Sequence, residues 1–451
     1  MSAVTGTLQP ITHGRVLAIA LPMTLANVAT PLSGFVNAAV VGQLGRADLL
    51  GAIALAAVLF DVVFWPFAFL RMGTTGLTAQ AVGARDRAEE SAALFRALLL
   101  ALVAGLVVVA LQAPLADLMF RLFSPSEAVE AAARRYYDIR VWAAPVAFAN
   151  YAVLGWMLGR GRATAGLALQ VFLNGVNAAG SVFFVLVLHC SVEGAAAASV
   201  LAECATLLLG LALASRRLRE ISLPPPSLVL DRARMVATVA VNRDVFIRTL
   251  ALISAYLFFV AQGARAGDAT LAANGVLNNL FLIGGYFLDG FATAAEALCG
   301  AAVGARDRGA FERAAKLALV WCFAVAAVIT IVFLAGGDWF VALVSKSAEV
   351  RAAAEPFLIY AALAPLAASL AFVLDGVFIG ATWGAAMRNT ALIAIALYFA
   401  AFWALAPSLG NHGLWLALLA WLLARGLAQA ALLPGLTRRT FAVSSPASPA
   451  A

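Results

Sequence analysis

Carboxylate side chains interrupt long apolar stretches of this sequence at a few positions. Asp289 and Glu296 are seven residues apart, which is two turns of one helix, so both would lie on the same face. That spacing suits a relay for protons or other cations. Asp375 stands in Leu374-Asp-Gly376, where the glycine lets another backbone approach, and it is the strongest ion-binding candidate in the second half of the chain. A structural carboxylate held by hydrogen bonds is the alternative for all three.

Other polar and aromatic side chains in these stretches are candidates for a substrate cavity. Flat rings accept varied apolar shapes and hold a cation against the ring face. Asp61 is expected to face the outer part of such a cavity, and Glu203 is a further candidate for cation coupling. The remaining cavity candidates are Trp65, Arg71, Tyr151, Gln262 and Tyr286. Packing between helices is the alternative for these rings and amides.

Membrane helices are needed to position these side chains. Of the 451 residues, 64% are hydrophobic and 12% are charged, and the mean hydropathy is +0.95. A soluble domain is about half apolar and about a quarter charged. The composition therefore excludes a water-soluble enzyme and a nucleic-acid-binding protein.

The apolar stretches predict an all-α polytopic membrane protein with twelve transmembrane helices. About 20 apolar residues cross a bilayer core, and the predicted spans are 15–43, 50–82, 92–118, 137–159, 163–188, 193–215, 241–263, 270–303, 312–335, 354–380, 385–408 and 412–436. The first span is too long for a cleaved signal peptide and is interrupted by Pro22, Pro31 and Asn37. Because both prolines remove a backbone hydrogen bond, we expect this helix to bend.

The basic residues predict the orientation. With the N-terminus inside, cytoplasmic positions hold 21 of the 30 Lys and Arg residues and the other side holds eight. Positive charge favours the cytoplasmic side, so both termini are expected there. The remaining cation, Arg71, is the only one that we place clearly at membrane depth, and we expect it to pair with Asp289 or Glu296.

The sequence lacks the motifs of metal sites, redox sites, nucleotide-binding sites and potassium channels. The four cysteines have no C-x-x-C spacing and the three histidines are far apart, so we expect no metal or redox site. The chain has no phosphate-binding G-x-x-x-x-G-K-[ST] motif and no potassium-filter sequence. We therefore expect no enzyme activity and no cofactor, apart from a coupling ion.

An internal repeat shows that the chain is a duplication. Val82-Gly-Ala-Arg-Asp-Arg87 recurs at residues 303–308, an offset of 221 residues, and the same offset pairs Gly42 with Gly263 and Gly159 with Gly380. Six helices separate the copies, so both halves have the same topology, with an axis along the membrane normal. We predict two pseudo-symmetric six-helix lobes over 1–215 and 241–438, a cytoplasmic linker over 216–240 and a disordered tail over 439–451.

Two equal lobes are what transport by alternating access requires, because their relative movement exposes a central site to each side in turn. Several segments of the sequence resemble the DinF branch of the MATE (multidrug and toxic compound extrusion) family. They are residues 69–80, 242–244, 261–265, 286–297 and 374–381. The resemblance extends over nearly the whole chain. It implies two six-helix lobes in a V and export of amphipathic, often cationic, compounds in exchange for H⁺ or Na⁺.

The chain departs from this family at two positions. Where relatives carry an aspartate on the first helix, this sequence has Asn37, and a second carboxylate of many relatives is replaced by Ser181. The partner amide Asn177 is kept, and Ser199 falls near a hydroxyl of the family. With Asn174, these residues predict a polar pocket in the first lobe that has no titratable group.

We therefore predict a multidrug antiporter of the bacterial inner membrane, a monomer among lipids that takes small amphipathic or cationic substrates and no nucleic acid. Coupling would rest on carboxylates other than the usual one. A flippase for lipid-linked sugars and an uncoupled facilitator are the alternatives. A flippase should have a strongly cationic cavity, and Arg71 as the only cation clearly at depth favours drugs.

Overall fold

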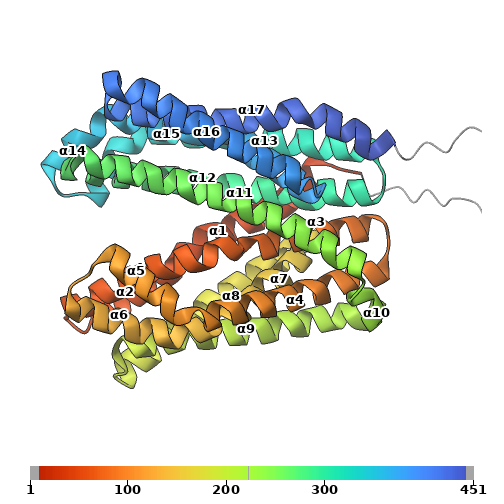
Figure 1. Ribbon diagram of the computed structural model, residues 1–451, viewed down its shortest axis with the longest axis horizontal. Coiled ribbons are helices and arrows are strands. Elements are labelled where there is room, and N and C mark those ends of the chain that lie inside the picture. The colour runs from red at the N-terminus through yellow and green to blue at the C-terminus, as the bar shows by residue number, and fades with distance from the viewer. Residues whose placement is uncertain (1–9, 222, 443–451) are drawn as a thin grey trace, which may run out of the picture. The chain divides into compact units, whose positions relative to one another are not determined.

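The structure, a computed structural model, describes residues 10–221 and 223–442, and every regular element in these ranges is helical (Figure 1). In the first half the elements are α1 (His13–Gly42), α2 (Ala47–Phe64), η1 (Trp65–Ala68), α3 (Phe69–Gly83), α4 (Arg87–Ala110), α5 (Gln112–Phe123), α6 (Glu127–Arg140), η2 (Val141–Ala143), α7 (Ala144–Gly159), α8 (Ala163–Ser181), η3 (Val182–Val187) and α9 (Ser191–Ile221). The rest are α10 (Pro226–Val229), α11 (Arg232–Arg265), α12 (Asp268–Gly304), α13 (Arg308–Val344), α14 (Ala348–Ala354), η4 (Glu355–Phe357), α15 (Leu358–Gly380), α16 (Gly384–Leu409) and α17 (Asn411–Ala442).

Twelve helical spans within the described residues are long and apolar enough to cross a membrane, which confirms the predicted number. Their ends differ from the predicted ones because helices continue in polar sequence beyond the apolar part. The sixth span reaches Ile221 and the seventh begins at Arg232, so the segment between them is shorter than the expected linker. Residues 439–442 of the expected tail belong to α17, and 443–451 lie outside the described residues.

The contacts divide the chain into two units. The N-unit comprises Leu25–Thr78 and Asp86–Val239, and the C-unit comprises Met1–Thr24, Ala79–Arg85 and Ala240–Ala451. The division falls inside α1, α3 and α11, so neither unit is one continuous half of the sequence.

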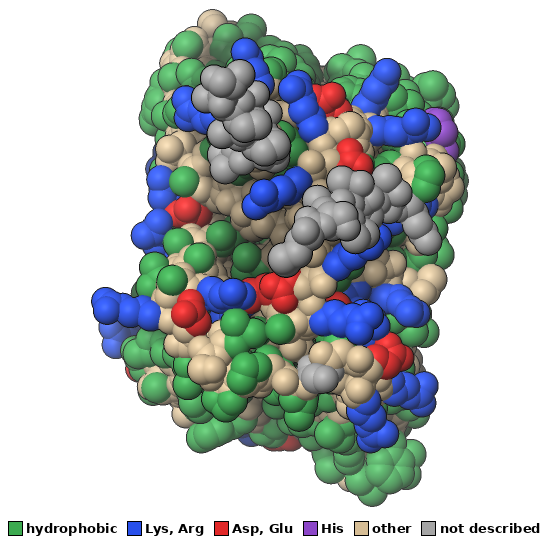
Figure 2. Space-filling view, turned by 90° about the vertical axis from the view of Figure 1, so that its right-hand side faces the viewer, with side chains coloured by type: hydrophobic (Ala, Val, Ile, Leu, Met, Phe, Trp, Pro, Cys, Tyr) green, Lys and Arg blue, Asp and Glu red, His purple; other side chains and the backbone are tan. Residues whose placement is uncertain are grey.

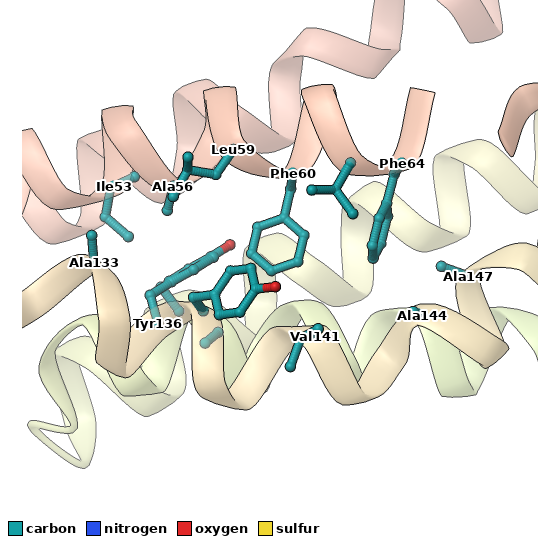
Figure 3. Close-up of a cluster of buried hydrophobic side chains, with 14 of the residues drawn as sticks. Ile53, Ala56, Leu59, Phe60, Phe64, Ala133, Tyr136, Val141, Ala144 and Ala147 are labelled. Atoms are coloured by element: carbon teal, nitrogen blue, oxygen red, sulfur yellow. The ribbon is translucent and has the colours of Figure 1, made fainter. Parts of the chain in front are cut away.

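Rings and small residues fill the core of the N-unit. Figure 3 shows Phe60 and Phe64 projecting from α2 toward the opposite helices, which carry Tyr136 and Ala144. The ring centroids of Phe60 and Tyr136 lie 6.0 Å apart, and those of Phe64 and Phe148 lie 5.2 Å apart. Because lipid is as apolar as these side chains, close packing rather than removal from water holds such helices together.

Glycines allow two helices of the C-unit to cross closely. A Cβ atom on Gly376 of α15 would lie 2.1 Å from the backbone oxygen of Ala292 on α12, and one on Gly380 would lie 2.4 Å from that of Glu296. No side chain fits at these distances. The prediction that the glycine beside Asp375 admits another backbone is confirmed.

The two copies of the repeated motif meet inside the C-unit. A Cβ on Gly83 would lie 1.9 Å from the oxygen of Ala301, and a Cβ on Gly304 would lie 1.9 Å from the oxygen of Gln80. Each of these residues is offset by 221 from its counterpart, so the two contacts are the same contact made twice. This reciprocal pattern is that of a two-fold interface.

The other residues of the motif turn the chain between helices. Arg85 and Arg306 both adopt left-handed backbone conformations, with φ of 57° and 56°. The next residues cap the following helices: the Asp86 carboxylate accepts from the Glu89 N–H and the Asp307 carboxylate from the Ala310 N–H, both at 2.9 Å. Both copies thus end one helix and begin the next in the same way.

An ion pair and a hydrogen bond attach the first turn of α11 and the preceding α10 to α4 within the N-unit. Glu89 pairs with Arg96 and with Arg234, and the Arg96 guanidinium donates to the Leu228 carbonyl oxygen at 3.1 Å. The neighbouring Glu90 pairs with Arg160 at 2.9 Å. Burial lowers the pKa of the Arg160 guanidinium from its usual value, and the Glu90 carboxylate opposes that effect.

Candidate functional site

A hydrogen-bonded pair of neutral side chains joins the two positions at which the resemblance implies carboxylates. The Ser181 hydroxyl at the end of α8 donates to Asn37 Oδ1 of α1 at 2.6 Å, and both side chains are buried. The turn that follows Ser181 is the π-helical segment η3, a kind of irregularity that often marks functional sites. Neither member of the pair titrates in the physiological range.

The second predicted amide continues this polar face one turn earlier on α8. Asn177 Nδ2 donates to the Ser199 hydroxyl of α9 at 2.9 Å, and Ser199 in turn donates to the Ala195 oxygen at 3.1 Å. The Tyr136 hydroxyl lies 3.5 Å from the Ser199 oxygen. Three helices, α6, α8 and α9, therefore meet through buried hydroxyl and amide groups.

Asn174 makes a separate contact with α1. It accepts from the Ser33 hydroxyl at 2.7 Å and donates to the Ala29 carbonyl oxygen at 2.8 Å. These contacts surround Pro31 in the sequence, while α1 runs as one helix through Pro22 and Pro31. The expected bending of α1 stays a prediction.

Charged groups extend the polar network in the N-unit. Arg140 Nη1 donates to the Tyr136 hydroxyl at 3.0 Å, and the guanidinium lies 4.5 Å from the centre of the Phe60 ring. It also interacts electrostatically with the carboxylates of Asp61 on α2 and Glu203 on α9. The predicted candidates Asp61 and Glu203 therefore both interact with the positive charge of Arg140.

Glu203 is held by an amide from the next helix. Asn150 Nδ2 of α7 donates to the Glu203 carboxylate at 2.7 Å and to its backbone oxygen at 2.9 Å. Glu203 lies one helical turn after Ser199, so both side chains project from the same face of α9. The Tyr151 hydroxyl, next in sequence to Asn150, interacts with the charges of Asp61, Glu203, Arg140 and Arg71.

Asp375 lies in a buried ionic cluster of the C-unit. Its Oδ2 atom accepts from Arg248 of α11 and from Arg425 of α17, the latter at 2.6 Å, and its Oδ1 atom accepts from Gln429 at 2.6 Å. The four side chains are buried in membrane-spanning helices. These contacts favour the structural alternative, while a role of Asp375 in ion binding stays a prediction.

The expectation that Arg71 is the only cation clearly at membrane depth is wrong. Arg248 and Arg425 have exposed fractions of 8% and 4% and lie well inside α11 and α17. Both already fell inside predicted spans, as did Arg140, so the sequence contained the signal. The count of cytoplasmic cations treated them as loop residues.

The remaining predicted residues are spread over both units. Glu296 is buried and Asp289 is half-buried on the continuous helix α12, which also carries Tyr286, half-buried. Gln262 accepts from Arg265 at 3.5 Å at the end of α11, and Trp65 is exposed in η1. Arg71 belongs to the N-unit and Asp289 and Glu296 to the C-unit, so their expected ion pair stays a prediction.

Comparison with known proteins gives a consistent set of relatives. The MatE family model matches residues 22–183 and 245–402 of the chain. The DNA damage-inducible protein F of Escherichia coli (strain K12) is 39% identical over 415 residues, which are 92% of this chain and 90% of the relative. Protein DETOXIFICATION 44, chloroplastic, of Arabidopsis thaliana is 26% identical over 423 residues, or 89% of this chain and 78% of the relative.

Solved structures share the fold. An outward-facing multidrug resistance MATE family transporter of the MOP superfamily matches with a TM-score of 0.83 at 19% identity, covering 96% of both chains. A MOP superfamily transporter from Pyrococcus furiosus, described as having a binding pocket of reverse polarity that suggests a different function, matches with a TM-score of 0.80 at 20% identity, covering 96% of this chain and 97% of that one. The predicted fold class is confirmed.

Proposed function

The chain belongs to the MatE family of membrane transporters, and from this premise we propose that it exports amphipathic cationic compounds by antiport with H⁺, with Glu203 as the proton-binding group. The observation that carries the proposal is the carboxylate of Glu203 bonded to the Asn150 amide at 2.7 Å and interacting with Arg140. An ionisable group inside a membrane helix is costly and marks a functional site by default.

The charges around Tyr151 explain how proton uptake would release a cation. With Asp61, Glu203, Arg71 and Arg140 all ionised, the two negative and two positive charges balance. Protonation of Glu203 leaves one excess positive charge beside the ring, which disfavours a bound cationic substrate. Entry of a proton and departure of a cation are then linked in the direction that antiport needs.

Three other carboxylates are candidates for a coupling role, and Asp375 fits that role less well than Glu203. The two guanidinium groups on Asp375 already offset its charge. Asp289 and Glu296 remain candidates for a second cation site, and sodium remains the alternative coupling ion. The amides and hydroxyls around Asn37 would supply neutral oxygen ligands, which suit Na⁺ as well as a polar substrate group.

Efflux of a fluorescent cation from proteoliposomes tests the proposal. Under an imposed pH gradient without sodium, wild type should transport and Glu203→Gln should fall to the level of empty liposomes. Glu193→Gln is the matched control, because Glu193 lies on the same helix but pairs with Arg135 at 2.6 Å on an exposed part of the N-unit. Transport by Glu203→Gln at the wild-type rate would refute Glu203 as the coupling group. A sodium gradient as the sole driving force would refute H⁺ as the coupling ion.

A flippase for anionic lipid-linked sugars is the second candidate, and Arg140 at the polar network is the observation that favours it. A transporter of the same fold from Pyrococcus furiosus has a binding pocket of reverse polarity that suggests a different function for that protein. Transfer of a fluorescent anionic polyprenyl-phosphate sugar across the same vesicles, with no efflux of cations, would select this function. Equal cation flux with and without an ion gradient would instead indicate a facilitator.

A further inference from the structure

A groove opens between the start of α13 and the end of α17 in the C-unit, with a volume of about 400 Å³. The α13 residues that line it recur every three or four positions, so they form one face of that helix. α13 packs on α12 and α15, and α17 packs on α15 and α16. The lining residues are Arg308, Phe311, Glu312, Ala315, Lys316, Leu319 and Val320 of α13 and Leu433, Pro434, Thr437 and Arg438 of α17.

The rim of the groove carries excess positive charge. Arg308 pairs with Glu312 at 2.8 Å, so these two charges offset each other. The exposed side chains of Lys316 and Arg438 add two positive charges, and the lining includes no second carboxylate. Arg438 uses its Nε–H on the Pro434 oxygen at 3.3 Å, which leaves four of its five donors for other partners. Figure 2 shows Lys and Arg side chains spread over the face at which α17 ends.

The apolar side of the groove continues along the membrane-spanning part of both helices. Val320 lines the groove and is 51% exposed, and Phe323, one turn further along α13, is 38% exposed. On α17, Leu432 is 42% exposed beside the lining residue Leu433. A cationic rim above exposed apolar side chains matches a molecule with an anionic head and a hydrocarbon chain.

We propose that this groove binds an anionic phospholipid, with the phosphate between Lys316 and Arg438 and an acyl chain along Leu319 and Val320. Basic pockets between membrane helices bind anionic lipid headgroups in this manner. A free phosphate would leave the apolar wall without a partner.

Native mass spectrometry of the purified full chain, titrated with phosphatidylglycerol or phosphatidylcholine, tests the site. Wild type should retain phosphatidylglycerol in preference to phosphatidylcholine. Because a basic residue near a membrane surface contributes about 1 kcal/mol to anionic lipid binding, the double variant Lys316→Gln with Arg438→Gln should bind phosphatidylglycerol at least about tenfold more weakly. Inorganic phosphate at equal concentration should not displace the lipid.

Arg313→Gln is the matched control, since Arg313 is exposed on α13 three residues before Lys316 but does not line the groove. It should bind phosphatidylglycerol as wild type does. Val320→Asp places a carboxylate on the apolar wall and should weaken lipid binding with both cations intact. Equal lipid retention by the double variant and Arg313→Gln, or displacement by phosphate alone, would overturn the proposal. Elution of every variant as a monodisperse peak verifies that binding, and not folding, has changed.

Discussion

Asp375 shows what a single carboxylate contributes when two guanidinium groups surround it. Arg248 and Arg425 reach it from different helices, so the carboxylate joins α11, α15 and α17 through one side chain. The cluster carries one excess positive charge. Removing the carboxylate of the cluster should therefore change the free energy of unfolding by a different amount than removing one of its cations.

Asp375→Asn should destabilise the protein more than Arg425→Gln. The first variant leaves two buried guanidinium groups without a counter-charge, which costs about 3–5 kcal/mol. The second leaves Arg248 paired with Asp375 and loses a charge-assisted hydrogen bond, at about 1.5–3 kcal/mol. The measurement is the free energy of unfolding in bicelles by steric trapping. Asp338→Asn, at an exposed aspartate, is the control and should stay near wild type. An equal or larger loss for Arg425→Gln would contradict the charge argument.

At the same scale, the structure brings neutral residues of the predicted pocket into contact, and their role as a pocket stays a prediction. Asn37 with Ser181 and Asn177 with Ser199 form the contacts that a polar pocket needs. The sequence does not predict the electrostatic interaction of Arg140 with Asp61 and Glu203, because partners on different helices have no fixed spacing in the sequence. The predicted spans contained Arg140, but hydropathy does not show which carboxylates on neighbouring helices interact with a cation inside a span.

Between elements, backbone-to-backbone contact at glycines sets how closely helices approach. Such contacts are common in membrane helices, where small residues replace the hydrophobic driving force available in water. At the reciprocal contact of Gly83 with Ala301 and Gly304 with Gln80, the two backbones lie so close that no Cβ fits on either glycine.

Gly83→Ala and Gly304→Ala should each destabilise the C-unit, and by similar amounts, because the two contacts are equivalent. Overpacking by one methyl group costs about 1–3 kcal/mol when the backbone must shift. Gly275→Ala on α12 is the control, since no atom lies within 4 Å of its added Cβ, and it should leave stability unchanged or raise it by about 0.5–1 kcal/mol. The free energies of unfolding of the three variants and wild type, measured by steric trapping in bicelles, test this prediction. A large difference between the two motif variants would contradict the equivalence of the contacts.

The existence and order of the twelve helical spans followed from hydropathy, because length and apolarity alone determine what crosses a bilayer. The helix ends did not, since a helix continues into polar sequence for as long as its backbone and caps allow. Asp86 and Asp307 show the exception: the identical motif predicted equivalent local structure, and both residues cap their helices.

At the scale of the whole molecule, the two units do not coincide with the two halves of the sequence on either side of the linker. The C-unit includes residues 1–24 and 79–85 from the first half of the sequence. Thr24 donates to the Phe287 oxygen, and Gln80 donates to the Gly380 oxygen at 2.8 Å. A sequence pattern of two consecutive six-helix repeats does not reveal this exchange, because it arises from tertiary contacts.

Residues 232–451 expressed alone should therefore fail to form a stable unit. They lack the segments that contact Phe287, Ala301 and Gly380, so those surfaces stay unpartnered. Coexpression with residues 1–221 should restore a detergent-stable complex, detected by affinity purification through a tag on one fragment. Stable accumulation of 232–451 without its partner, resistant to protease, would show that these segments are dispensable.

The reciprocal fit of the two glycine motifs also says something about descent. Two identical six-helix chains in the same membrane orientation would form this contact twice across a two-fold axis. Each motif would then place its glycine against the backbone of the other chain. Gene fusion would leave both halves of such an interface in one polypeptide, each free to diverge elsewhere. The six identical residues in both copies fit descent from such a homodimer, in which the two glycines leave no room for a side chain.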